Sequence, residues 1–314
     1  MHMADALLSP ALGAGFYGAS TLALVWSTRE LGRRAEPALA ATMGVLGAFV
    51  FAAQMLNFAI PGTGSSGHLA GGMLLAAVLG PASAFVVMTS VVLVQCLLLG
   101  DGGLLALGAN VFNLGFFPCF IGYPLYRWLA GAAPSPSRRS LALGAGALLS
   151  VELGALSVAI ETVASGMTPL RLRELGALMV GIHFPIAIAE ALVTAVAAAM
   201  LWRLKPTAVA AGPAPTERVT RLLLAASLCA ALGATVAVWF ASPRPDGLEW
   251  ALSRTGGAAA VQQREPAQPW PAVSAQTSAQ GLGGAAVVLL MCAAIGVTGV
   301  LVRRRRSAAT RRAA

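Results

Sequence analysis

Three histidines are the side chains of this 314-residue sequence best suited to bind a transition metal. They are His2, His68 and His183, and His2 directly follows Met1. Because histidine is large for a second residue, we expect Met1 to stay on the chain with a free α-amine. That amine, the deprotonated amide nitrogen of His2 and its imidazole Nδ1 can then close two fused chelate rings around one ion. The first candidate site is therefore the N-terminus itself.

The geometry of this chelate discriminates between metals. The three nitrogens are nearly coplanar and leave one equatorial position open, which suits Ni²⁺ or Cu²⁺ and can accept Co²⁺. Zn²⁺ prefers tetrahedral sites and fits less well. His68 can supply the fourth nitrogen, because the glycines of residues 62–67 let its loop approach a buried ion. Two plainer interpretations stay open: His2 on a disordered terminus, and His68 hydrogen-bonded to loop carbonyls at the membrane interface.

The third histidine has a different expected role. His183 and Glu190 are seven positions apart, so a helix places them on one face. Ionisable residues inside a membrane usually face the interior of the bundle. We expect these two to support the packing around the site rather than to bind the ion. Asp5, Ser66 and Gly67, which neighbour the expected ligands, are assigned the same supporting role.

The composition indicates that membrane-spanning helices position these residues. Hydrophobic residues make up 57% and charged residues 11% of the chain, and the mean hydropathy is +0.77. These values are typical of a polytopic protein embedded in a lipid bilayer. The apolar segments lack the alternation of a membrane barrel, so the expected fold class is all-α. The net charge of +9 comes from arginine clusters between apolar runs, which favours cytoplasmic loops over a nucleic-acid partner.

Apolar runs predict a bundle of about seven helices, followed by a linker and a module of two more helices. The expected helices cover residues 12–28, 38–60, 69–80, 82–99, 104–128, 140–164, 175–203, 219–241 and 282–302. The arginine clusters predict a multi-pass protein with its N-terminus outside, its C-terminus inside and all three histidines towards the outer side. The expected parts are a metal-binding transmembrane component (1–204), a cytoplasmic Pro-rich linker (205–218), an accessory domain (219–306) with an external loop (242–281), and a cytoplasmic tail (307–314).

One motif in the outer loop is misleading. Residues 62–67 fit G-x-G-x-x-G, but a dinucleotide site requires a preceding strand and a βαβ unit, whereas membrane helices flank this loop. The sequence has no Walker A motif, and Lys205 is its only lysine, so the chain hydrolyses no ATP by that route. Without a clustered catalytic constellation, an enzyme is disfavoured.

Four blocks of the sequence resemble a known family. Residues 1–5, MHMAD, and 61–68, PGTGSSGH, are similar to the cobalt/nickel-binding substrate component of energy-coupling-factor ABC transporters. The block DGGLLALGANVFN at 101–113 and the segment from His183 to Glu190 extend the resemblance over residues 1–204. It implies that the terminal amine, the amide and imidazole of the second residue, and the loop histidine bind the ion. These roles fall on Met1, His2 and His68.

One position departs from the family pattern. Many members have Asp-Gly behind the initial residues, whereas this chain has Asp5 followed by Ala6, so the turn behind the ligands differs. In the tail, Pro-Asp-Gly-Leu-Glu at 245–249 resembles a small accessory component that is often a separate subunit. The plain alternative for this motif is an ordinary external turn.

The resemblance also implies a mechanism and partners. Ni²⁺ or Co²⁺ is the expected cargo, bound as substrate with no further cofactor. The partners are a separate transmembrane coupling protein and two cytosolic ATPases in a bacterial cytoplasmic membrane. The alternative is a secondary cation transporter or channel, in which His183 and Glu190 form an ion or proton path and His2 is incidental.

Overall fold

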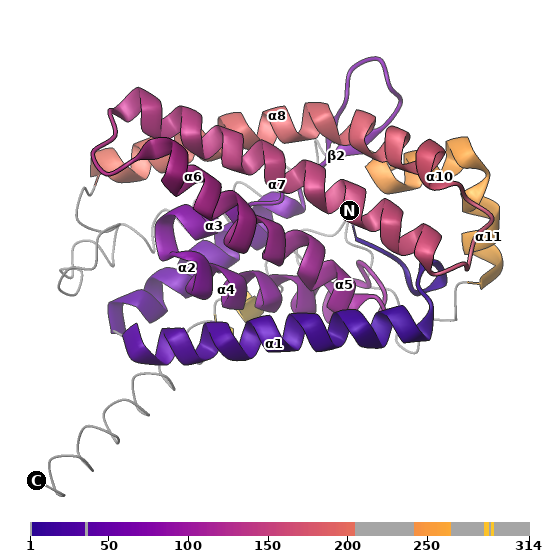
Figure 1. Cartoon of the computed structure of the whole chain (residues 1–314), viewed down its shortest axis with the longest axis horizontal. Helices are drawn as coiled ribbons and strands as arrows, with labels where there is room; N and C mark the ends of the chain where they lie inside the picture. The colour runs from indigo at the N-terminus through magenta and orange to yellow at the C-terminus, as the bar shows by residue number, and fades with distance from the viewer. Residues whose placement is uncertain (1, 35–36, 205–241, 265–285, 289, 292–314) are drawn as a thin grey trace, which may run out of the picture.

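The computed structural model of this chain describes residues 2–34, 37–204, 242–264, 286–288 and 290–291. Helices dominate these residues (Figure 1). In chain order the elements are η1 Asp5–Leu7, α1 Pro10–Arg34, α2 Pro37–Gln54, β1 Phe58–Ala59, β2 Ser66–Gly67, α3 Gly72–Leu79, α4 Pro81–Val94, η2 Gln95–Leu99, α5 Leu107–Val111, η3 Phe112–Gly122, α6 Tyr123–Ala130, α7 Pro136–Ala164, α8 Leu172–Leu204, α10 Gly247–Thr255 and α11 Gly257–Arg264. The prediction of an all-α protein is confirmed.

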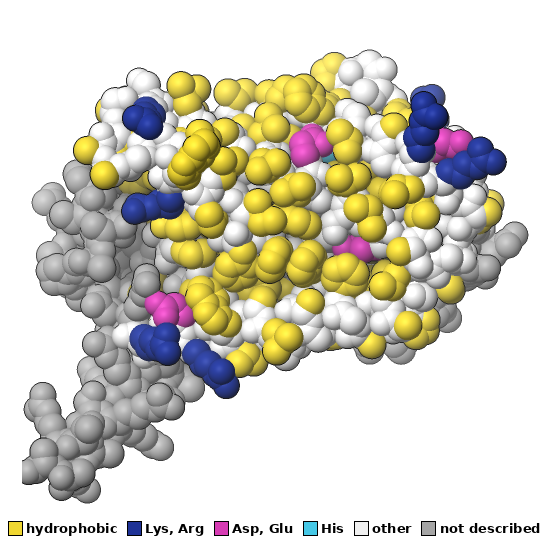
Figure 2. Space-filling model, viewed as in Figure 1, with side chains coloured by type: hydrophobic (Ala, Val, Ile, Leu, Met, Phe, Trp, Pro, Cys, Tyr) yellow, Lys and Arg dark blue, Asp and Glu magenta, His cyan; other side chains and the backbone are white. Residues whose placement is uncertain are grey.

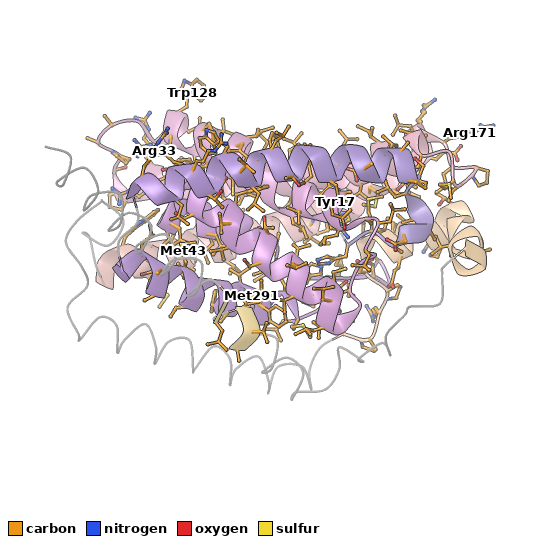
Figure 3. All side chains as sticks on the ribbon, turned by 90° about the horizontal axis from the view of Figure 1, so that it is seen from below. Tyr17, Arg33, Met43, Trp128, Arg171 and Met291 are labelled. Atoms are coloured by element: carbon orange, nitrogen blue, oxygen red, sulfur yellow. The ribbon has the colours of Figure 1, made fainter. Side chains whose placement is uncertain are left out.

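Several of these helices have the dimensions of membrane spans. Among the described residues, Pro81–Leu99, Pro136–Ala164 and Leu172–Met200 are long and apolar enough to cross a bilayer. Arginine side chains gather towards the two ends of the long axis (Figure 2). Mostly apolar side chains, with a few acidic groups among them, cover the face between the ends. Arg33 and Arg171 lie at opposite ends (Figure 3). The ends of the bundle thus resemble the two membrane surfaces, and which end faces outside stays a prediction.

The outer loop begins earlier than predicted. A helix was expected over residues 38–60, but α2 ends at Gln54, and β1 pairs antiparallel with β2 through Phe58–Gly67 and Ala59–Ser66. Gly62 and Gly64 have φ angles of 75° and 77°, which only glycine adopts at low cost, and they turn the chain back between the strands. The loop is therefore a hairpin with a fixed register.

The predicted break after the short third helix is present. α3 ends at Leu79, and its cap residue Gly80 has a positive φ of 79°, which favours glycine. Pro81 then begins α4. The run expected as one helix over 104–128 consists instead of α5, η3 and α6. η3 is π-helical and contains Pro118, which has no amide hydrogen to donate to an α-helical ladder.

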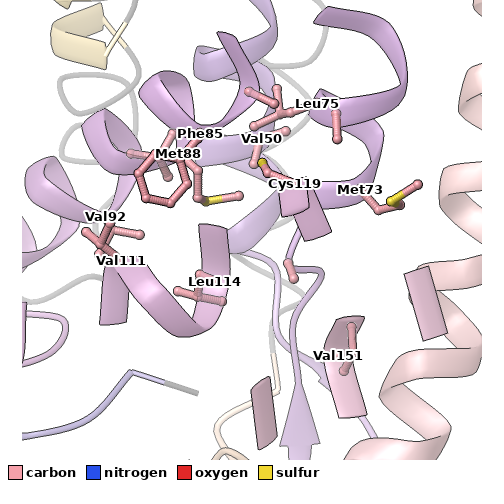
Figure 4. Packing of buried hydrophobic residues seen from close by; sticks show 14 of the residues in the cluster. Val50, Met73, Leu75, Phe85, Met88, Val92, Val111, Leu114, Cys119 and Val151 are labelled. Atoms are coloured by element: carbon pink, nitrogen blue, oxygen red, sulfur yellow. The ribbon is translucent and has the colours of Figure 1, made fainter. Parts of the chain in front are cut away.

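The core lies where α4 packs against η3 and α3. Phe85, Met88 and Leu114 are buried there (Figure 4). A side-chain carbon added at Gly115 would lie 3.1 Å from the Phe85 ring, so the absence of a side chain in η3 allows the two helices to approach closely. The close packing of α3, α4 and η3 forms the core next to the loop of residues 55–71.

The tail segment corrects a second expectation. Residues 242–281 were expected as a loop, yet α10 and α11 lie within them. Asp246 and Glu249 form a reciprocal capping box: Glu249 N donates to Asp246 Oδ1 at 2.8 Å, and Asp246 N donates to Glu249 Oε2 at 3.0 Å. The acidic residues of the Pro-Asp-Gly-Leu-Glu motif thus start a helix. The linker 205–218, the helix 219–241, most of the helix 282–302 and the tail 307–314 lie outside the described residues.

Candidate metal site

The N-terminal segment is held inside the bundle. It runs from the start of α1 back among the helices (Figure 1). Met3 N donates to Asn110 Oδ1 at 2.7 Å, and Asn110 Nδ2 donates to Met3 O at 3.1 Å. Gly103 N donates to the same carbonyl at 2.9 Å. Three hydrogen bonds thus hold the backbone N–H and C=O of Met3, the residue that follows His2. His2 therefore does not lie on a disordered terminus.

Asp5 makes a second connection between the terminus and the loop before α5. Its Oδ1 accepts from Ala106 N at 3.0 Å. A side chain at Gly103 would collide with Asp5, which explains why the 101–103 turn contains glycine at this point. The contacts of Asp5 are those of a residue that positions the N-terminal segment. Met1, the expected source of the amine, lies outside the described residues.

The rings of His2 and His68 face each other. Their centroids are 5.6 Å apart and their planes differ by 23°. This separation places the two imidazoles near enough to contribute to one site. His2 Nδ1 also lies 3.4 Å from Asp101 Oδ1, and the His2 side chain is only 4% exposed. The two histidines that the sequence analysis selected are therefore brought together.

Burial keeps both rings neutral. It lowers the pKa of His68 to about 4, and it lowers the pKa of His2 against the opposing effect of Asp101. A neutral imidazole has one nitrogen with a free lone pair, and only that nitrogen can bind a metal. In His68 the carbonyl of Leu69 lies 3.1 Å from Nδ1 and can only accept, so Nδ1 carries the hydrogen. The lone pair of His68 is consequently on Nε2.

Glu190 supports the loop of His68. Its two carboxylate oxygens accept from Ala70 N and Gly71 N, each at 2.8 Å, and the side chain is buried. Gly67 packs against Ile186 so closely that an added side-chain carbon would lie 2.5 Å from Cγ1. Thus α8 holds the loop on both sides of His68.

His183 is buried on the same helix but its contacts are different. Its Nδ1 donates to Met179 O at 2.8 Å. A side-chain carbon added at Gly247 would lie 2.7 Å from Cε1 of His183. The His183 ring therefore packs directly against the first residue of α10. Among the described residues, no three His, Cys, Asp or Glu side chains are grouped to hold an ion. Within the described part of the chain, clustered side chains therefore do not complete a site around His2 and His68.

The Pro-Asp-Gly-Leu-Glu segment covers the loop of His68. Ser66 N donates to Pro245 O at 2.8 Å, and Ser66 Oγ donates to Arg244 O at 2.7 Å. Trp250 Nε1 donates to Thr63 O at 2.9 Å. Ser66, expected beside the ligands, therefore links the loop to the tail segment. Sequence spacing gives no sign of this contact, because about 180 residues separate the two partners.

Asp246 directly precedes Gly247, which packs against His183. Burial alone raises the pKa of a carboxyl, but the positive charge of the chain's α-amine and the hydrogen bond from Glu249 N hold the pKa of Asp246 well below its usual range. An ionised carboxylate at this position favours a cation.

Sequence reasoning missed four polar residues around the site, namely Gln54, Gln95, Asp101 and Asn110. Gln54, Gln95 and Asn110 are buried and hydrogen-bonded. A signal was present in the sequence, because glutamine inside an apolar run is costly unless it has a partner. Residue type alone, however, does not identify the partner that each of these side chains finds in the fold.

Buried neutral imidazoles within a helical membrane bundle define the class of protein: a membrane protein with nitrogen donors for a transition metal. The family described as the cobalt uptake substrate-specific transmembrane region matches residues 2–208, and the chain belongs to this family. The PDGLE domain matches residues 220–280. The resemblance of both parts noted in the sequence is thereby confirmed, and the family consists of cobalt and nickel transport proteins.

Individual relatives agree with this assignment. A putative fused nickel transport protein NikMN of Archaeoglobus fulgidus is 38% identical over 161 residues, 51% of this chain and 52% of that protein, so the match spans about half of its length. The fused nickel transport protein NikMN of Rhodobacter capsulatus is 30% identical over 71% of this chain and 68% of its own. The cobalt transport protein CbiM of Moorella thermoacetica is 32% identical over 62% of this chain and 77% of its own.

A solved structure has the same fold. The crystal structure of a truncated transition metal transporter superimposes with a TM-score of 0.58 at 30% sequence identity. The match covers 66% of this chain and 99% of that one.

Proposed function

We propose that this chain captures Ni²⁺ or Co²⁺ outside the cell as the substrate-binding subunit of an energy-coupling-factor ABC importer. The ion binds to the α-amine of Met1, the amide nitrogen and Nδ1 of His2, and Nε2 of His68. The observation that supports this most is the pair of facing imidazoles, because His2 is clamped beside His68 and burial keeps both rings neutral. Family membership supports the same cargo.

The partners follow from the family resemblance and from what the chain lacks. Its sequence has no ATP-binding motif of the Walker A type, so ATP hydrolysis belongs to two cytosolic ATPases. A separate transmembrane coupling protein transmits that energy to the bundle. The N-terminus and the histidines face outside and the C-terminus faces the cytoplasm of a bacterial cell.

The tail segment has a role in this cycle. Arg244 and Pro245 accept hydrogen bonds from Ser66, two residues before His68, and α10 starts against His183. Any movement of this segment is therefore transmitted to the loop that contains a ligand. We assign to the tail module the opening and closing of the metal site.

A titration of the purified full chain with Ni²⁺ and Co²⁺ tests the proposed function. We expect one ion per chain and tighter binding of Ni²⁺, because planar nitrogen donors suit it best. His68→Ala removes one donor and should weaken binding by at least about tenfold, the loss typical even of outer-shell partners. His183→Ala should lower the melting temperature with little change in affinity. An equal loss of binding in His183→Ala, with the fold intact, would contradict the supporting role of that residue.

Gly247→Ala tests the role of the tail segment. The new carbon would lie 2.7 Å from Cε1 of His183, so the start of α10 must shift. The hydrogen bonds that Ser66 donates to Arg244 O and Pro245 O, just before α10, should weaken as a result. We expect faster hydrogen exchange at the Ser66 amide and severalfold faster release of Ni²⁺. Gly181→Ala is the matched control, because a carbon added at Gly181 on the same α8 helix meets nothing within 4 Å. Unchanged exchange in Gly247→Ala would remove the basis for coupling.

A further inference from the structure

A buried pair of glutamines connects His2 to the backbone beside His68. His2 Nε2 lies 3.2 Å from Gln95 Oε1, Gln95 Nε2 donates to Gln54 Oε1 at 2.7 Å, and Gln54 Nε2 donates to Ala70 O at 2.6 Å. Gln54 and Gln95 are 4% and 1% exposed, so water does not replace these bonds. Gln95 is also the first residue of the π-helical η2, a type of segment found often at functional sites.

The direction of this chain of bonds is fixed at its far end. The carbonyl of Ala70 can only accept, so the group of Gln54 that faces it is the NH₂. The same NH₂ lies 3.8 Å from the Sδ of Met88, another atom that can only accept. The oxygen of Gln54 therefore faces Gln95 and accepts a hydrogen bond from the NH₂ group of Gln95. The oxygen of Gln95 is left for His2, and a hydrogen bond between them requires that His2 Nε2 is the donor.

We infer that Gln95 and Gln54 are positioning residues that hold His2 in the tautomer with its hydrogen on Nε2 and its lone pair on Nδ1. This inference rests on the proposed function, in which Nδ1 is the imidazole nitrogen that closes a chelate ring with the amide nitrogen of His2. In the other tautomer that nitrogen carries a hydrogen and cannot bind.

Asp101, beside the Nδ1 edge of the His2 ring, favours the opposite tautomer. Asp101 Oδ1 lies 3.4 Å from Nδ1, and a carboxylate at that distance attracts a hydrogen to the nitrogen that should bind the metal. The glutamine chain opposes this effect by giving the hydrogen a partner at Nε2. Once an ion occupies Nδ1, the same carboxylate adds a favourable negative charge beside it. Gln95 thus leaves the lone pair of Nδ1 on the side of the ring that faces Asp101.

The tautomer can be read directly by ¹⁵N NMR of the metal-free full chain labelled at histidine. Only three histidines contribute signals, and His2→Ala assigns that of His2. We expect wild-type His2 to have its hydrogen on Nε2. In Gln54→Met the amide of Gln95 loses its fixed partner, so we expect a mixture of tautomers and about tenfold weaker Ni²⁺ binding, within the range for outer-shell partners. Gln54 is connected to His2 through hydrogen bonds of Gln95. A change of tautomer in Gln54→Met therefore reports the loss of these bonds rather than a general packing defect.

Further variants separate the explanations. Ser90→Ala removes a buried hydroxyl of α4 that donates to Val86 O, in the same helix. The tautomer of His2 and the Ni²⁺ affinity should therefore be unchanged. Gln95→Met removes the acceptor that faces His2 Nε2 and should also give a mixture of tautomers. If this variant fails to fold, the tautomer in the wild-type protein and in Gln54→Met still tests the inference. A wild-type His2 with its hydrogen on Nδ1, or an unchanged tautomer in Gln54→Met, overturns this inference. Undiminished Ni²⁺ binding by His2→Ala overturns the proposed function instead.

Discussion

Adding one alanine in front of Met1 is expected to weaken Ni²⁺ binding by roughly a hundredfold, about 2.8 kcal/mol of binding free energy. The extension moves the α-amine away from its position in the chelate and converts the nitrogen of Met1 into an amide, while every side chain is kept. The segment has little freedom to compensate, because Asn110 and Gly103 hold the peptide of Met3. Isothermal titration of the wild-type and extended proteins measures the difference.

A cleavable extension provides the matched control. A protease site placed so that cleavage leaves Met1 as the first residue allows the same preparation to be titrated before and after cleavage. Binding should be weak before cleavage and should recover afterwards, with the melting temperature of the metal-free protein nearly constant. If the extended chain binds Ni²⁺ as tightly as the cleaved one, the terminal amine is not a ligand and the chelate is wrong.

The sequence singled out the two facing histidines but not the residues that support them. His2 and His68 could be selected because imidazole chemistry follows from residue type and the arginine clusters predict a common side of the membrane for both. Their partners could not, since Gln95, Gln54 and Asn110 act through contacts that span tens of residues in the chain. Residue type indicates that such groups need partners but does not say which ones.

The fold shows the same division. Apolar runs predicted the helical membrane bundle and the break at Gly80. They overextended the second helix, because the hairpin of β1 and β2 depends on pairing between residues 58–59 and 66–67 rather than on hydrophobicity. The helix α10 was missed because its segment is too polar to stand out as an apolar run, although the capping box of Asp246 and Glu249 is itself a sign of a helix start.

Replacing Glu190 by glutamine is expected to destabilise the protein and to weaken Ni²⁺ binding. Both carboxylate oxygens accept a backbone N–H, and an amide can accept only through its one oxygen. Either Ala70 N or Gly71 N then faces an NH₂ group and loses its bond, at a cost of about 1–3 kcal/mol for a buried donor. The loop that starts at His68 relaxes, so the melting temperature and the affinity should fall together.

Glu161→Gln is the matched control for this prediction. Glu161 is also buried, but it accepts from Asn113 Nδ2 at 2.9 Å and Ser157 Oγ at 2.7 Å, which belong to η3 and α7 rather than to the His68 loop. Its replacement should lower the melting temperature with the affinity for Ni²⁺ intact. The pair also separates support from transport. If Glu190→Gln binds Ni²⁺ normally and melts normally, yet abolishes uptake by the assembled transporter, Glu190 belongs to an ion or proton path instead.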